Sequence, residues 1–76
     1  MLFYFDMDDG ERVVHDALGT ELGSLEEAAA EALKVLPELA RERVQDRGRA
    51  IQAVVRDERG QPVFRATLVV SGEWLS

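Results

Sequence analysis

Three aspartates near the start of the chain, Asp6, Asp8 and Asp9, come closest to a chemical site in residue type and spacing. They stand in the string FYFDMDDG, in which aromatic residues lead into the acids and then into Gly10. Closely spaced carboxylates can supply a nucleophile or bind a divalent cation. A small metal-dependent enzyme that uses these three acids is therefore one hypothesis for the chain.

The same string resembles the first motif of haloacid-dehalogenase phosphatases, in which an aspartate nucleophile ends a strand and a second aspartate follows two residues later. Asp6 and Asp8 have that spacing, but those enzymes need a doubly wound sheet and downstream motifs that 76 residues cannot hold. An EF-hand reading also fails, because Gly10 stands where an acid ligand is required and no closing glutamate follows. We therefore interpret Asp6, Asp8 and Asp9 as residues of a solvated strand end and turn.

The other reactive side chains form no recognisable site. His15 is the only histidine and there is no cysteine, which excludes an imidazole ligand set, disulfides and thiolate metal sites. We expect His15 at a strand edge and Ser24 as a helix cap rather than a nucleophile. The glycine turns at Gly10 and Gly60 do not make a phosphate-binding loop. We expect no catalytic, cofactor-binding or metal-binding residues, and thus no enzyme.

The charge of the chain is −6 in total and unevenly distributed. Residues 1–31 carry nine acids and one base, whereas residues 32–76 carry six acids and eight bases. An acidic protein repels phosphate backbones, so we expect no nucleic-acid partner. The bases near Arg41, Arg43, Arg47 and Arg49 are typical of a helix C-terminus, and aromatic stacking partners are absent nearby. A nucleic-acid contact through these arginines is the weaker alternative.

Alternating apolar residues predict strands at residues 2–8, near 12–16, at 51–57 and at 62–70. The Asp9-Gly10 pair predicts a hairpin between the first two strands, and Asp57–Gly60 predicts a tight turn between the last two.

Between the two strand pairs, the sequence predicts one long helix. Ser24 is its N-cap, Glu27 completes a capping box, and an apolar stripe continues to about Val44. Pro37 interrupts the stripe without changing its phase, so we expect one kinked helix or two collinear pieces.

This order predicts a single α+β domain over residues 1–76: a β-β-α-β-β chain whose four-stranded, mainly antiparallel sheet carries the helix on one face. The other face would be open. Tyr4, Val63 and Val69 could make it apolar enough to pair with a second copy, so we expect a homodimer. Trp74 is either an interface anchor or part of a tail that folds back over this face.

The whole chain resembles a family of short bacterial proteins that carries a domain of unknown function. The resemblance covers residues 3–70 and rests on an aromatic strand running into an acidic glycine turn, a D-x-x-G-x-E-L segment, an alanine-rich helix and a V-x-D-E-x-G-x-P-V hairpin: Phe3–Gly10, Asp16–Leu22, Leu25–Leu36 and Val55–Val63. It implies no activity.

A looser resemblance is to HicB-type antitoxins, through Gly19-Thr20 and the Ser24–Ala28 start of the helix. It implies at most the partner-binding half of such a protein, in which an acidic module binds a basic toxin. Neither a membrane-length apolar run nor a secretory signal is present, so we expect a cytoplasmic protein. The preferred hypothesis is a non-enzymatic protein-interaction or regulatory module.

Overall fold

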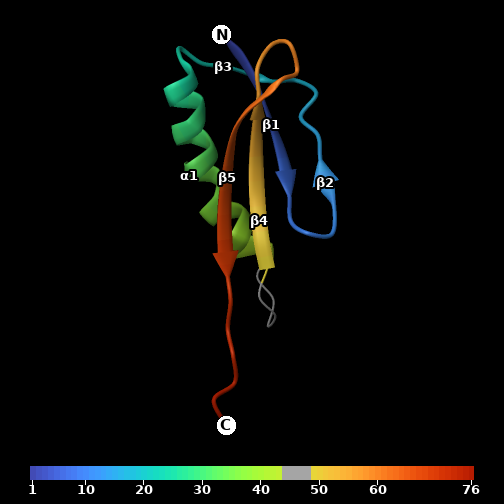
Figure 1. Ribbon diagram of the computed structural model, residues 1–76, viewed down its shortest axis with the longest axis vertical. Coiled ribbons are helices and arrows are strands. Elements are labelled where there is room, and N and C mark those ends of the chain that lie inside the picture. Colours follow the sequence, from blue (N-terminus) through green and yellow to red (C-terminus); the bar gives the residue numbers. More distant parts are fainter. Residues whose placement is uncertain (44–48) are drawn as a thin grey trace.

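The structure is a computed structural model that describes residues 1–43 and 49–76 (Figure 1). One helix packs on one face of an antiparallel sheet, which confirms the predicted α+β class. The elements follow one another in the order β1 (Leu2–Asp8), β2 (Val13–Val14), β3 (Thr20–Glu21), α1 (Leu25–Arg43), β4 (Arg49–Arg56) and β5 (Pro62–Val70).

The sheet has the strand order β2-β1-β4-β5, and every pairing is antiparallel. The predicted bounds of β1 and β5 are confirmed. The second strand is shorter than the predicted 12–16, because only Val13 and Val14 pair with β1. Sequence analysis missed β3, whose two residues pair with Leu2 and Phe3 of β1.

The register assigns side chains to the two faces of the sheet. Tyr4 of β1 lies opposite Arg56 of β4, and Asp6 lies opposite Val54. Because side chains alternate between faces along a strand, Tyr4, Asp6 and Arg56 share the open face. Phe3 occupies the other face, which α1 covers.

Helix α1 has Ser24 as its N-cap, as predicted, but the Glu27 carboxylate of the predicted capping box binds the amide of Gly23 and not that of Ser24. The Glu27 amide donates a hydrogen bond to Oγ of Ser24 at 3.2 Å, and Oε2 of Glu27 accepts one from the Gly23 amide at 2.9 Å. Both bonds satisfy backbone donors at the helix start. Pro37 lies inside one continuous helix that is described as far as Arg43. The predicted end near Val44 lies outside the described residues.

The core lies between α1 and the strands β4 and β5, against which the helix mainly packs. Alanines on the inner face of α1 let the helix approach the sheet closely. The buried apolar residues are Phe3, Ala28, Ala32, Leu36, Ala40, Ile51, Ala53, Val55 and Ala66.

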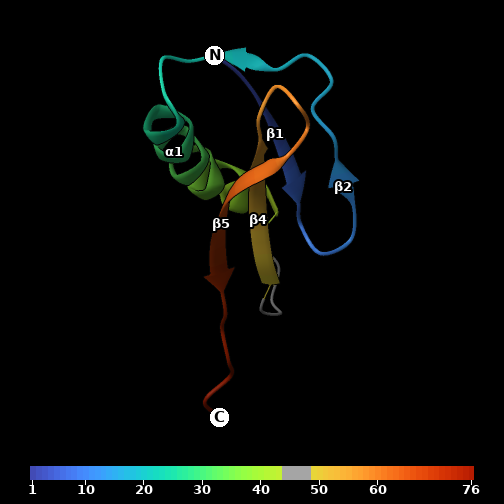
Figure 2. The ribbon, with the colours of Figure 1, turned by 45° about the horizontal axis from the view of Figure 1, so that its top comes forward.

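Residues 71–76 follow β5 as a tail that runs away from the sheet (Figures 1 and 2). Strand β4 begins at Arg49, which pairs with Val70, so the tail has no ladder partner in the described chain. Trp74 and Leu75 are both 88% exposed. The alternative in which Trp74 folds back over the open face is therefore wrong for this structure.

Candidate functional site

The three aspartates of the proposed metal or nucleophile site have different environments and different hydrogen-bond partners. Asp6 and Asp9 are only 8% and 5% exposed, which corrects the assignment of this cluster to a solvated strand end. Asp8 accepts a hydrogen bond from the Gly10 amide at 2.9 Å, and Asp9 accepts from the Glu11 and Arg12 amides at 2.9 and 3.0 Å. Asp8 and Asp9 therefore shape the β1–β2 turn, as predicted. Within residues 1–43 and 49–76, no three His, Asp or Glu side chains are arranged to hold a metal ion.

Arg56 donates two hydrogen bonds to the carboxylate of Asp6. Its Nε lies 2.7 Å from Oδ2 of Asp6, and its Nη2 lies 3.0 Å from Oδ1. The guanidinium also stands 5.0 Å from the ring centroid of Tyr4, which faces it across the β1–β4 ladder. Bidentate pairing and cation–π contact both favour arginine over lysine at this position. Both oxygens of Asp6 are thus engaged within the protein.

Asp16 ties the segment after β2 to this pair. Its amide donates to Oδ1 of Asp6 at 3.0 Å, and its carbonyl accepts from Nη2 of Arg56 at 3.1 Å. The Asp16 carboxylate accepts from the Phe5 amide at 3.1 Å and from the Leu18 and Gly19 amides at 3.0 Å. The hydrogen bonds of Asp16 therefore hold the D-x-x-G segment in its conformation and fix it to the sheet.

The two carboxylates of this network have lowered pKa values. For Asp6, the main cause is the hydrogen bond from Arg56, with a further contribution from the Asp16 amide. For Asp16, the pKa falls mainly because the Gly19 amide donates to it, helped by the amides of Phe5 and Leu18. Hydrogen bonds to a carboxylate favour its charged form. Both groups stay ionised at neutral pH, as structural acceptors.

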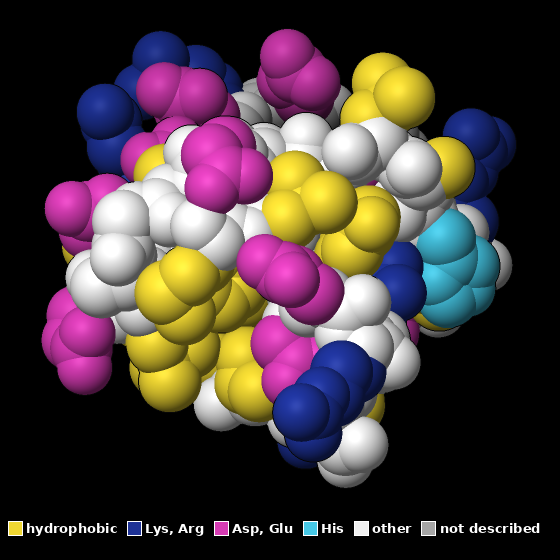
Figure 3. Space-filling view, turned by 90° about the horizontal axis from the view of Figure 1, so that it is seen from above, with side chains coloured by type: hydrophobic (Ala, Val, Ile, Leu, Met, Phe, Trp, Pro, Cys, Tyr) yellow, Lys and Arg dark blue, Asp and Glu magenta, His cyan; other side chains and the backbone are white. Residues whose placement is uncertain are grey.

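His15 lies at the surface beside the network, just after β2 and outside the strand in which it was predicted. Its Nδ1 is 3.5 Å from Oδ2 of Asp6, and its side chain is 75% exposed. Figure 3 shows this one histidine, in cyan, next to a basic side chain. Asp6 is already held by Arg56 through both of its carboxylate oxygens, so it is not reserved for orienting His15 as the acid of a catalytic triad is.

Part of the open sheet face is covered by the chain itself. A Cβ on Gly19 would lie 3.0 Å from Cδ1 of Leu2 and 3.1 Å from Cε1 of Tyr4, so this segment rests directly on both side chains. Leu2 and Tyr4 are accordingly half-buried. The open face still exposes apolar side chains at both ends of the sheet: Val63 and Val69 on β5, and Val13, which pairs with Asp8, on β2.

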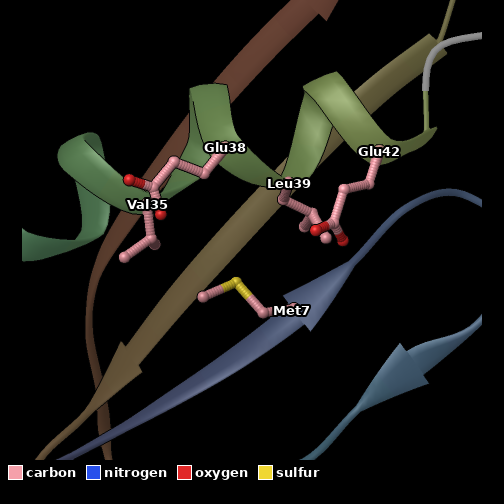
Figure 4. Close-up of a pocket in the computed structure, with 5 residues that line it drawn as sticks. All are labelled: Met7, Val35, Glu38, Leu39 and Glu42. Carbon is pink, nitrogen blue, oxygen red and sulfur yellow. The ribbon is translucent and has the colours of Figure 1, made fainter.

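A shallow hollow of about 260 Å³ lies between α1 and β1 (Figure 4). Met7 rises from β1 toward Val35 and Leu39, and Glu38 and Glu42 stand at the rim. It exists because α1 packs mainly over β4 and β5 and leaves the β1 side less covered. It offers apolar contact at its floor and the negative charge of two glutamates at its rim.

The free edge of β5 is the least protected element of the described sheet. Strand β5 pairs with β4 on one side, and no described strand pairs with the other. Long edge strands template pairing with another chain unless charges, prolines or bulges blunt them. Pro62 and the register shift near Arg56 lie at the start of β5, so residues 63–70 keep a free edge whose one charge is Arg65.

Apolar side chains flank this edge on both faces. On the open face, Val63 and Val69 are exposed, the latter by 67%. On the helix face, three partly buried residues of β5 line the edge: Phe64, Leu68 and Val70. An added strand would therefore find apolar contacts above and below it, which is what strand addition needs for specificity.

Helix α1 overhangs the same edge. Both ribbon views place its N-terminal half on the outer side of β5. Val35 faces β1 in the hollow, and Leu33, about 200° round the helix from it, faces the opposite flank. Leu33 is 56% exposed.

The basic cluster predicted near the helix end falls mostly outside the part of the chain whose side chains are described. Arg41 is exposed at the surface of α1. Arg47 lies among residues 44–48, and the side chains of Arg43 and Arg49 are likewise outside the description. The nucleic-acid alternative stays a prediction.

In the described part of the chain, α1 is too polar to cross a membrane. A family model, Domain of unknown function (DUF6894), matches residues 2–69. The match covers more than half of the chain, so the chain belongs to this family, and the predicted resemblance is confirmed. The likeness to HicB-type antitoxins is not confirmed. No curated protein and no solved structure matches the chain.

Proposed function

We propose that this DUF6894 protein is a non-enzymatic interaction module that binds an extended segment of another polypeptide along the free edge of β5. One observation carries the proposal: residues 63–70 present a strand edge that no described strand pairs with, and apolar side chains flank it on both faces. Backbone hydrogen bonds would supply affinity, and the flanking apolar residues would supply specificity.

The alternatives have less support. A metal-dependent enzyme would need free carboxylates, whereas Asp6 is held by Arg56, and Asp8 and Asp9 accept hydrogen bonds from turn amides. A HicB-like role rests only on sequence likeness. The hollow beside Met7 is shallow, and its polar lining consists of the two glutamates Glu38 and Glu42. The β5 edge remains the surface whose geometry implies a defined kind of binding.

Site-specific photo-crosslinking in the cell that naturally produces the protein tests the proposal. A photoreactive amino acid replaces Thr67, which is exposed on β5, and in a matched control it replaces Ala30, which is exposed on α1. Crosslinked products are analysed by mass spectrometry. We expect one dominant polypeptide adduct at position 67, attached through an extended segment, and none at position 30.

Two results would contradict the proposal. The first is no adduct at position 67 under conditions in which the protein is abundant. The second is the same broad set of adducts at positions 67 and 30, which indicates random collision rather than a strand-binding edge. The mass of a dominant adduct also distinguishes a second copy of this chain from a different protein.

A further inference from the structure

We infer that the segment bound at the β5 edge is the β5 strand and tail of a second copy of this chain, arranged about a two-fold axis. This inference rests on the proposed function and names the partner. Two identical edges that pair antiparallel form a closed, self-complementary contact. The sheet would then run continuously from β2-β1-β4-β5 of one copy into β5-β4-β1-β2 of the other.

The alternation of side chains restricts how the two edges can align. Directly opposed residues of an antiparallel pair place their side chains on the same face of the sheet. Residues 63, 65, 67 and 69 point to the open face, and 64, 66, 68 and 70 point to the helix face. If the tail continues this alternation, Glu73 and Leu75 join the open face, and Trp74 joins the helix face.

One alignment satisfies both charge and size along residues 62–76. With Val69 opposite the partner's Val69, Arg65 faces the partner's Glu73, and Phe64 faces the partner's Trp74. The same alignment sets Ala66 against the partner's Gly72 and Val63 against the partner's Leu75. The exposed charges of β5 and the tail, Arg65 and Glu73, are thereby paired twice, once on each side of the axis.

Neighbouring alignments lose this match. Moving the axis to Leu68 sets Glu73 against the partner's Val63, and moving it to Val70 sets Arg65 against the partner's Leu75. In each of these shifted alignments, both charged side chains lie opposite uncharged ones. Opposite charges across strands stabilise pairing, so the alignment centred on Val69 is the one that the sequence of this edge favours.

The alignment also covers the apolar surface that one copy leaves exposed. The partner's Trp74 would lie beside Phe64, on the face beneath the overhanging N-terminal half of α1 and its exposed Leu33. Tryptophan is a common anchor residue of protein interfaces. Pairing over residues 62–76 extends for about 50 Å, at about 3.3 Å per residue. The tail, which lacks a ladder partner in its own chain, gains one.

A charge-reversal cycle measured by sedimentation equilibrium tests the inference. The wild-type chain is expected to dimerise to twice its 8.5 kDa mass. Arg65→Glu alone and Glu73→Arg alone each bring two pairs of like charges together, and each should raise the dissociation constant roughly tenfold. The double variant exchanges the charges and should recover most of the wild-type affinity. Val69→Lys, which opposes two lysines at the axis, should leave a monomer.

Each outcome separates the two claims. A wild-type monomer at all concentrations, together with a position-67 adduct to a different protein, overturns self-pairing and leaves the proposed function standing. A monomer without any position-67 adduct overturns both. A dimer in which the double reversal fails to rescue either single variant overturns the proposed pairing. Circular dichroism of each variant establishes that the exposed substitutions leave the fold intact.

Discussion

Arg56 and Asp6 are joined by two hydrogen bonds, of 2.7 Å from Nε to Oδ2 and 3.0 Å from Nη2 to Oδ1. They come from opposite ends of the chain and meet because β1 pairs with β4. Asp16 adds its own amide and carbonyl to the same pair. The pair thus fastens the N-terminal hairpin, the segment after β2 and the C-terminal half of the sheet together.

Replacing Asp6 by alanine should destabilise the fold. The change leaves the Asp16 amide and the Arg56 guanidinium without their acceptor in a largely buried place, at a cost of about 2 kcal/mol in the free energy of unfolding. Asp8→Ala is the matched control from the same strand and removes one exposed bond to Gly10. Urea unfolding should show the larger loss for Asp6; equal losses would contradict a central role for the network.

Stability should fall in acid in a predictable direction. The pKa values of Asp6 and Asp16 are lowered below 3.8 in the folded protein. The folded state therefore binds these protons less readily than the unfolded state. The stabilisation that both groups contribute is complete above about pH 5, roughly one unit above their unfolded values, and is lost as the pH falls through their folded values.

Thermal unfolding between pH 2 and pH 6 measures this effect, with Asp6→Asn as the comparison. The variant cannot titrate at position 6, so its stability should depend less steeply on pH below 4. A wild-type protein whose stability is constant down to pH 2, or an Asp6→Asn variant with an unchanged acid slope, would contradict the assigned role of the carboxylate.

Replacing Gly19 by alanine should lower the stability of the fold more than the same change at Gly60 or Gly72. Its φ is +77°, and an added Cβ would contact Leu2 and Tyr4 at 3.0 to 3.1 Å. Gly19→Ala combines conformational strain with crowding and should cost roughly 2 kcal/mol. Gly60 has φ +81°, and the nearest contact of an added Cβ is at 3.9 Å, so Gly60→Ala introduces backbone strain without crowding. This substitution should lower the free energy of unfolding by about 1 kcal/mol.

Gly72→Ala is the control for both changes, since nothing lies within 4 Å of its added Cβ. Its unfolding midpoint in dilute solution should match that of the wild type. If Gly19→Ala and Gly60→Ala lose the same stability, the segment after β2 does not rest on the sheet as closely as described.

The sequence predicts the elements of this fold well, because their signals are local. Alternation marks β1 and β5, and Ser24 with Glu27 marks the start of α1. The Asp6 environment is not local: it depends on the β1–β4 register, which places Tyr4 opposite Arg56. Alternation already places Tyr4 and Asp6 on one face, and a known register would have identified their partner.

Two other features escaped prediction for similar reasons. Strand β3 has only two residues, and its pairing with Leu2 and Phe3 gives it no periodicity of its own. The free edge of β5 follows from the order of strands in space, to which no short stretch of sequence corresponds. Both depend on contacts between distant segments.

The helix start offers a local test. Ser24→Ala removes the acceptor for the Glu27 amide and should lower the free energy of unfolding by about 1 kcal/mol. Ser71→Ala, in the exposed tail, is the matched control and should leave it unchanged. Chemical denaturation of both variants decides the point; a Ser24 variant as stable as the wild type would show that the cap contributes little.

Hydrogen exchange of the tail amides tests pairing between two copies at the β5 edge most directly. In a single copy, residues 71–76 have no described ladder partner, so any slow exchange there reports pairing with another chain. We predict that amides within Ser71–Leu75 become protected as the wild-type concentration rises, and that Val69→Lys abolishes this protection. Tail amides that exchange as fast as an unstructured peptide at every concentration would contradict pairing between copies at this edge.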